Sequence, residues 1–274
     1  MSNRSRARVA LASALCPALL WLGAAPAAAS PTCYGLRPTI PGFSGDDRLI
    51  GTEGSDVIVA RGGDDYIDGK GGNDRICGQD GADTIIAGDG DDLVLGGAGA
   101  DVITGGEGSD LVDGAGGADT ITGGPGNDDL RGGSEDDRFI EGSAPNGSDL
   151  IAGDAHDDVL DYGARTAPVN VSPDGVADDG EGSERDNVRT DFEEVIGGSG
   201  DDRLVGLGAP NVFHGSGGDD VLVGGTGQDR LFGDAGEDDL FGDEGSDVLD
   251  GGGSRDRCDP AAQGGRTFNC EVVP

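Results

Sequence analysis

Large apolar residues recur every nine positions along the first half of this chain, each two residues after an aspartate. The apolar residues of this series are Leu49, Ile58, Ile67, Ile76, Ile85, Val94, Ile103, Val112, Ile121, Leu130 and Phe139. The aspartates that precede them, here called register aspartates, are Asp47, Asp56, Asp65, Asp74, Asp83, Asp92, Asp101, Asp110, Asp119, Asp128 and Asp137. A glycine lies two residues before each of them except Asp137, which follows Glu135. A fixed short period of this kind indicates a solenoid, in which each unit packs only against its neighbours.

The nine-residue unit reads Gly-x-Asp-x-(apolar)-x-Gly-Gly-x, as in residues 99–107. Its x-(apolar)-x stretch alternates, which predicts a strand of about three residues whose middle side chain faces inward. The glycine-rich remainder accepts backbone angles that bulky residues avoid, so it predicts a turn. Because so short a strand is not stable alone, the units must stack. Two units make one coil with a strand on each side, so units two apart lie directly above one another.

This stacking places the register aspartates in two rows. The first edge contains Asp47, Asp65, Asp83, Asp101, Asp119 and Asp137, and the second contains Asp56, Asp74, Asp92, Asp110 and Asp128. Since adjacent coils lie about 4.8 Å apart, these like charges repel unless a cation lies between them. Carboxylates and uncovered turn carbonyls are oxygen ligands, which suit calcium better than magnesium. No cluster of cysteine and histidine is present to favour zinc.

The repeat resembles the calcium-binding nonapeptide Gly-Gly-x-Gly-x-Asp-x-U-x of the RTX (hemolysin-type) family, where U is a large aliphatic residue. The resemblance covers most of residues 45–258. It implies an all-β fold, a parallel β-roll or β-solenoid, in a secreted bacterial protein. It also implies that calcium is held in the turns by register aspartates and backbone carbonyls, with about a dozen ions in all.

The period slips after Phe139 and returns after an insert. The predicted metal ligands beyond Asp137 are Asp149, Asp158, Asp202, Asn211, Asp220, Asp229, Asp238, Asp247 and Asp256. Three extra residues precede Asp149, and the period is absent from residues 161–190. Glu193, nine residues before Asp202, marks the return to the repeat. The β-rich insert is interpreted as a structural divider or, alternatively, as a partner-binding loop, and its acidic residues 177–186 are expected to be solvated.

The N-terminus has the pattern of a secretory signal peptide. Three arginines precede an apolar run, Val9–Gly23, and small residues then offer a cleavage site near Ala29–Ser30. No other apolar run approaches the length needed to span a membrane. The chain therefore divides into a signal peptide (1–29), an N-terminal cap (30–44), a first block of repeats (45–160), the insert (161–196), a second block (197–258) and a C-terminal cap (259–274). We expect a secreted monomer.

Four cysteines remain after cleavage: Cys33, Cys77, Cys258 and Cys270. An even number in an exported protein favours disulfides. The predicted roll is long, whereas bonded cysteines need Cα atoms within about 7 Å. This geometry favours Cys33–Cys77 and Cys258–Cys270, each fixing a terminal segment over one end of the roll. Intermolecular bonds are the alternative.

Net charge excludes one class of partner and predicts the role of calcium. The formal charge is −36, and removal of residues 1–29, which carry three arginines and no acid, makes it −39. Binding to nucleic acid is excluded because the potential has the wrong sign. Self-repulsion opposes compaction, so calcium binding and folding are predicted to be one linked event.

No catalytic motif is present. The two histidines, His156 and His214, are far apart, and neither a zinc-protease helix motif nor a Gly-x-Ser-x-Gly elbow occurs. A non-enzymatic, calcium-binding structural or cell-surface protein is the first hypothesis. An adhesion or polysaccharide-binding module is the second, which aromatic residues gathered on one face would favour. A carbohydrate-active enzyme built on the insert is the third, which a buried, unpaired carboxylate in a cleft would favour.

Overall fold

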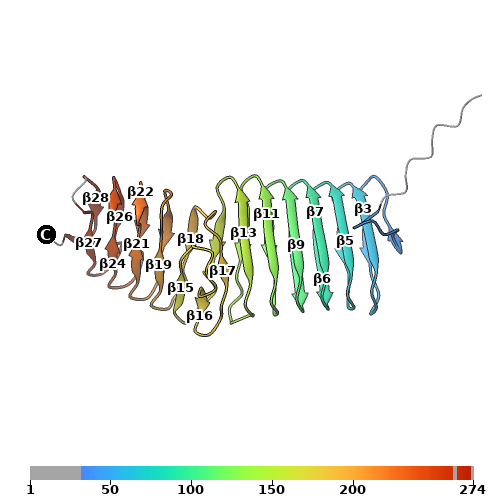
Figure 1. Cartoon of the computed structure of the whole chain (residues 1–274), viewed down its shortest axis with the longest axis horizontal. Helices are drawn as coiled ribbons and strands as arrows, with labels where there is room; N and C mark the ends of the chain where they lie inside the picture. The colour runs from blue at the N-terminus through green and yellow to red at the C-terminus, as the bar shows by residue number, and fades with distance from the viewer. Residues whose placement is uncertain (1–31, 262–263, 273–274) are drawn as a thin grey trace, which may run out of the picture. The chain divides into compact units, whose positions relative to one another are not determined.

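The computed structural model describes residues 32–261 and 264–272, and the regular elements in this part of the chain are β-strands (Figure 1). The long sheet consists, in spatial order, of β2 (Arg48–Ile50), β4 (Tyr66–Asp68), β6 (Thr84–Asp89), β8 (Val102–Glu107), β10 (Thr120–Thr122), β12 (Arg138–Ile140), β14 (Val159–Asp161), β18 (Glu194–Ile196), β20 (Val212–His214), β23 (Arg230–Phe232), β26 (Val248–Asp250) and β28 (Arg266–Phe268).

Two shorter sheets form the other side of the coils. The N-terminal sheet consists of β1 (Ile40–Pro41), β3 (Val57–Gly62), β5 (Arg75–Asp80), β7 (Leu93–Ala98), β9 (Leu111–Gly116), β11 (Asp129–Ser134), β13 (Leu150–Ala155) and β17 (Asn187–Val188). The C-terminal sheet consists of β16 (Gly180–Glu181), β15 (Val169–Val171), β19 (Arg203–Val205), β21 (Val221–Val223), β24 (Asp239–Phe241), β27 (Arg257–Asp259) and β29 (Glu271–Val272). A fourth, two-stranded sheet pairs β22 (Thr226–Gly227) with β25 (Glu244–Gly245).

The strand register confirms the predicted parallel β-roll with two units in each coil. Ile58 pairs with Ile76 in the N-terminal sheet, an offset of eighteen residues. In the long sheet, Ile67 pairs with Ile85 at the same offset. The pairing of Phe139 with Leu160 spans twenty-one residues, because the chain accommodates the three extra residues before Asp149 without disturbing the ladder. Each nine-residue unit of the sequence therefore forms one half of an eighteen-residue coil.

The inward residue of each unit forms one continuous core. The apolar residues two positions after the register aspartates are at most 8% exposed in the first block, and Leu204, Leu222 and Leu240 are fully buried in the second. Each aliphatic side chain packs on the copies in the coils on either side, and burying one stabilises the fold by about 1.5–3 kcal/mol. Phe139 and Phe192 meet edge to face, with ring centroids 5.3 Å apart, where the repeat resumes after the insert.

Left-handed backbone in the turns explains the repeated glycines. Gly99 has φ of 128°, and a Cβ at this position would collide with the carbonyl oxygen of Gly81 in the preceding coil. Glu135 and His156 replace the glycine at the equivalent position and keep φ at 79° and 90°. The backbone conformation is thus a requirement of the turn, and the two non-glycine residues adopt it at a cost of about 1–3 kcal/mol each.

The insert interrupts one side of the roll and leaves the other intact. The long sheet passes directly from β14 to β18, with Leu160 opposite Val195. On the other side, β13 pairs with β17, whereas β15 pairs with β19 and, antiparallel, with β16. Val171 and Val188 supply the inward side chains here and are at most 2% exposed. The core therefore continues through the insert.

Both favoured disulfides are present. Cys33 is bonded to Cys77, and Cys258 to Cys270, each with Cα atoms 5.7 Å apart. Cys33 is fully buried beside Val59 in a small cluster outside the main core. The first bond joins the segment before β1 to β5, and the second joins the segment after β28 to β27. The two bonds therefore anchor the terminal segments of the roll.

The predicted signal peptide at residues 1–29 lies outside the described residues. Among the described residues, no helix is long and apolar enough to cross a membrane.

Candidate metal sites in the turns

Each register aspartate stands immediately before its strand, and all but Asp47 bond to the preceding coil through the carboxylate. Asp83 Oδ1 accepts the backbone N–H of Asp65 at 2.8 Å on the first edge, and Asp92 Oδ1 accepts that of Asp74 at 2.8 Å on the second. The same bond recurs along both edges in both blocks. Charge-assisted hydrogen bonds are stronger than neutral ones. They hold every carboxylate in the same place in its coil.

The second carboxylate oxygen, Oδ2, has no hydrogen-bond partner at most register positions. The aspartates with a buried, unpartnered Oδ2 are Asp65, Asp74, Asp83, Asp92, Asp101, Asp110, Asp119, Asp128, Asp137, Asp158, Asp220, Asp229, Asp238, Asp247 and Asp256. None of these side chains is more than 3% exposed. Leaving one buried acceptor unpaired costs about 1–3 kcal/mol, and more when it is charged. So many unpaired oxygens in one fold indicate that a cation belongs beside them.

Glycines keep open the space beside these oxygens. A Cβ on Gly105 would overlap Asp110 Oδ2 and would lie 2.6 Å from the carbonyl oxygen of Gly123 in the next coil. Gly78 has the same relation to Asp83 Oδ2 and, again at 2.6 Å, to the carbonyl oxygen of Gly96. A carboxylate oxygen and a turn carbonyl thus converge where the glycine has no side chain. This arrangement recurs along the roll and fits a small cation.

Burial makes the ionised register carboxylates costly in the absence of a cation. Burial raises the pKa of Asp83 to about 7 against the opposing effect of the N–H of Asp65, and the carboxylates of Asp101 and Asp65 raise it further. The pKa of Asp92 is raised to about 7 for the same reason, and that of Asp110 to about 6. Near neutral pH the folded chain therefore favours either a proton or a bound cation at Asp83 on the first edge and at Asp92 on the second.

The donor set distinguishes between metals. Within residues 32–261 and 264–272, no three side chains of His, Cys, Asp or Glu gather around one point. A cation in a turn would therefore be held by one or two carboxylates and by backbone carbonyls. Calcium accepts this mixture with variable geometry, whereas zinc prefers a compact set of nitrogen and sulfur ligands. The residues present fit calcium.

Four of the predicted aspartate ligands differ from the rest because local donors bond their Oδ2. Asp47 accepts the N–H of Phe43 at 2.6 Å, and Asp56 accepts that of Thr52 at 2.7 Å. The donor at Asp202 is the N–H of Gly198 at 2.6 Å, and at Asp149 it is the side chain of Asn146 at 3.2 Å. Each is at or beside the start of a run of repeats, where the preceding turn is irregular. The ligand role of these four aspartates, like that of the other predicted residues, stays a prediction.

The amide at position 211 keeps the register. Asn211 Oδ1 is buried and unpartnered, like the aspartate Oδ2 atoms, and its Nδ2 donates to the carbonyl oxygen of Phe192 at 3.4 Å. The amide therefore offers one neutral oxygen where its neighbours offer a charged one.

Sequence reasoning missed one register residue in the insert and did not assign another as a site residue. Asp186 Oδ1 accepts the N–H of Asp149 at 3.0 Å, and Glu193 Oε2 accepts the N–H of Asp158 at 3.0 Å. Glu193 had been aligned with the repeat by its spacing from Asp202. For Asp186 the available signal was the tripeptide Asp186-Asn187-Val188, which keeps the Asp-x-apolar pattern without the period or the glycine.

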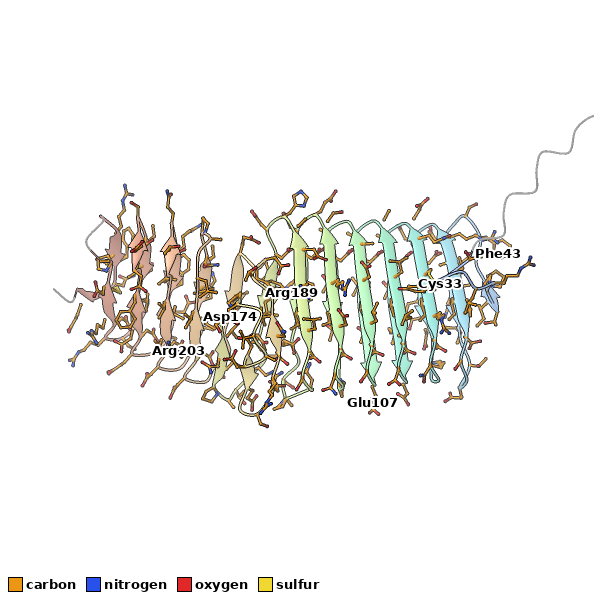
Figure 2. The ribbon with its side chains drawn as sticks, in the orientation of Figure 1. Cys33, Phe43, Glu107, Asp174, Arg189 and Arg203 are labelled. Carbon is orange, nitrogen blue, oxygen red and sulfur yellow. A yellow bond between two sulfur atoms is a disulfide. The ribbon has the colours of Figure 1, made fainter. Side chains whose placement is uncertain are left out.

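The expectation that the acidic residues 177–186 are solvated was wrong for three of them. Asp179, Glu184 and Asp186 are 1%, 8% and 0% exposed. Their carboxylates accept hydrogen bonds from backbone and side-chain donors of the insert and, at Asp186, also from the N–H of Asp149. Asp178 is exposed, as expected. None of the three has the unpaired carboxylate that would favour the carbohydrate-active enzyme. Figure 2 labels Asp174, in the insert, and Arg203, in β19, which lie beside this segment.

Comparison with known families gives one result. The family model described as the RTX calcium-binding nonapeptide repeat (4 copies) matches residues 41–76, 78–112, 104–139, 146–164, 196–231 and 232–262. These segments include every predicted ligand and leave out most of the insert. A search of curated proteins found no match.

Asp83→Asn tests the assignment of the register positions. The amide keeps an acceptor for the N–H of Asp65 and removes the charge beside the unpartnered Oδ2. The ionised form of Asp83 opposes folding without a metal, since its folded-state pKa of about 7 lies above the usual 3.8. We therefore expect the variant to require several-fold more calcium for folding, yet to be no less stable than wild type in chelator at pH 8. Circular dichroism measures both. Asp178→Asn, at an exposed position, is the control; equal effects of the two substitutions would refute the assignment.

Proposed function

Because this chain belongs to the family of RTX calcium-binding nonapeptide repeats, we propose that it is an exported structural protein whose β-roll folds when calcium binds in its turns. The observation that most directly supports this proposal is the row of buried, unpartnered Oδ2 atoms on both edges. Bound calcium would supply the positive charge that these oxygens lack. The chain's own residues do the rest: the aspartates hold one oxygen by a backbone N–H, and the glycines keep the adjoining space open.

The number of sites follows from how neighbouring coils share them. Each cation would lie between two coils, so a register aspartate would contribute to the cation on either side of it. The two edges together offer room for about a dozen ions. Loss of one site exposes the carboxylates of its neighbours to repulsion. Calcium binding is therefore expected to be cooperative along each edge.

The composition supports folding that depends on the metal. The chain carries a net charge of −36 and only 4% aromatic residues. Its core is one continuous cluster of mostly aliphatic side chains. Self-repulsion at this charge opposes compaction, and binding that occurs only in the folded state stabilises that state by mass action. Extracellular calcium modules bind at about 0.1–1 mM, so the roll would form outside the cell and not in the cytosol. The basic, then apolar N-terminus supports export by the general route.

Circular dichroism of the purified chain, titrated with calcium and then with magnesium, tests this function. We expect a cooperative change from coil to β-structure between about 0.1 and 1 mM calcium, and none with magnesium at the same concentrations. A full β-spectrum in chelator at pH 7.5 would refute calcium-dependent folding.

One surface favours adhesion to an acidic polysaccharide as a second function. On the outer face of the long sheet, His214 pairs with Phe232 across neighbouring strands, and their rings stack with centroids 4.6 Å apart. Arg230 lies 5.4 Å from the Phe232 ring, and two strands further along the sheet Phe268 is 49% exposed beside Arg266. Guanidinium groups bind carboxylates and sulfates in a bidentate manner, and aromatic rings offer a flat apolar face. Since the chain as a whole repels anions at its net charge of −36, an anionic sugar chain would bind this face only through the local pairing of arginines and rings.

Affinity electrophoresis in calcium separates this second function from the first. We expect hyaluronan in the gel to retard wild type, and the double substitution Arg230→Gln with Phe232→Ala to abolish the retardation. Val102→Ala, at a position 48% exposed in the first half of the same sheet, should behave as wild type. No retardation of wild type, or equal retardation of the double variant, would contradict the adhesion proposal and leave calcium-dependent folding unaffected.

A further inference from the structure

The row of unpartnered oxygens on the second edge stops at the insert. Asp128 Oδ2 is the last of the row in the first block. The next two register positions are Asp149 and Asp186, joined by the usual bond from N–H to Oδ1 at 3.0 Å. Asp149 Oδ2, however, accepts a bond from the Asn146 side chain at 3.2 Å, and Asp186 Oδ2 accepts one from the Tyr162 hydroxyl at 3.2 Å. Protein donors here occupy the oxygens that are free at most other register positions.

A buried arginine accompanies this change. The side chain of Arg165 is fully buried and forms ion pairs with Glu184 at 3.1 Å, Glu181 at 3.2 Å and Glu141 at 3.5 Å. Glu141 and Glu184 are themselves 1% and 8% exposed. Among the described residues, Arg165 is the one basic side chain buried in the roll. A guanidinium group keeps its charge at any pH that the protein meets.

One amide links the arginine to the register aspartates. Arg165 Nη2 donates to Asn146 Oδ1 at 2.9 Å, and Asn146 Nδ2 donates to Glu141 at 2.8 Å and to Asp149. The backbone N–H of Asn146 donates to Glu184 at 2.7 Å. Asn146 belongs to the three extra residues that interrupt the nine-residue period. The extra residues and the insert thus supply, together, the donors that the register aspartates need.

The first edge provides the comparison within the same coils. Asp158 Oδ2 and Asn211 Oδ1 are unpartnered on either side of the insert, as in the regular repeats. No guanidinium group reaches that edge among the described residues, and Glu193 keeps the register there. Beside the insert, protein donors therefore replace free oxygens on the second edge and not at Asp158 or Asn211 on the first.

We infer that Arg165 is a fixed cation that takes the place of calcium at this point of the second edge, so that residues 141–188 keep their structure in the absence of calcium. This inference rests on the proposed function, namely that calcium neutralises the regular turns. A buried guanidinium group that is paired with several carboxylates can be held in a fold, whereas removing one member of such a group leaves an uncompensated buried charge and is strongly destabilising. Burial and the carboxylates of Asp149 and Asp186 also raise the pKa of Glu141 to about 8, which lowers the charge that Arg165 must balance near neutral pH.

The insert around Arg165 would then be a preformed centre from which the roll folds. Ile151 and Val188 stay paired in the N-terminal sheet, and the fully buried Tyr162 belongs to the same core. The first block could then add coils on one side of this centre and the second block on the other as calcium binds. Folding would proceed outward from the insert, since a solenoid extends by adding units to an existing one.

Hydrogen exchange of the full chain in chelator at pH 7.5, followed by mass spectrometry, tests the inference. In wild type we expect amides of residues 150–151 and 187–189 to exchange at least tenfold more slowly than those of residues 84–122. Arg165→Gln should abolish this difference. Arg131→Gln, which removes an exposed arginine paired with Asp129, should preserve it. If Arg165→Gln keeps the protection in chelator, the inference is overturned.

Two further outcomes separate the inference from the proposed function. Fast exchange throughout wild type in chelator, with protection restored by calcium, would overturn the role of Arg165 and leave calcium-dependent folding standing. Slow exchange throughout wild type in chelator would overturn calcium-dependent folding. If Arg165→Gln does not fold even with calcium, Arg165→Lys decides: the retained charge should preserve protection of the insert in chelator, and complete loss would overturn the inference.

Discussion

A carboxylate buried in most turns, with one oxygen bonded and the other free, is the constraint on which this fold depends. Backbone N–H groups hold one oxygen of each register aspartate, as Asp65 does for Asp83, and so fix the free oxygen in an enclosed place. Such a row of charges cannot persist in a low-dielectric environment without a counterion. The glycines, the short strands and the continuous aliphatic core all follow from the need to stack these turns at a constant spacing. The same feature that opposes folding of the bare chain thus makes folding responsive to a cation.

Much of this arrangement could be predicted from the sequence because the period carries it. Each unit contacts only its neighbours, so the spacing of Asp47 and Asp65 defines a contact as well as a pattern. The inward position of Ile58, the eighteen-residue coil and the pairing of Cys33 with Cys77 follow from that spacing and are confirmed. The cysteine pairing needed one more fact, the distance between the ends of a stacked roll.

The insert could not be predicted in the same way, because its contacts do not follow the period. Asp149 and Asp186 are thirty-seven residues apart in the chain and adjacent in space. Burial of Arg165 depends on three carboxylates, that of Glu141 before the insert and those of Glu181 and Glu184 in one turn within it, and nothing in the local sequence around it signals this. The acids near Glu184 were expected to be solvated since they lie in a polar segment without an apolar pattern. Only the fold shows that these charges balance one another.

The most direct test of the account is to locate the cations in crystals of the calcium-loaded chain by long-wavelength anomalous diffraction. The account predicts peaks in the anomalous map beside the free oxygens of Asp83 and Asp101 on the first edge and of Asp92 and Asp110 on the second. It predicts no peak between Asp149 and Asp186, where protein donors occupy both carboxylates. Peaks confined to exposed acids such as Asp178, with none in the turns, would contradict it.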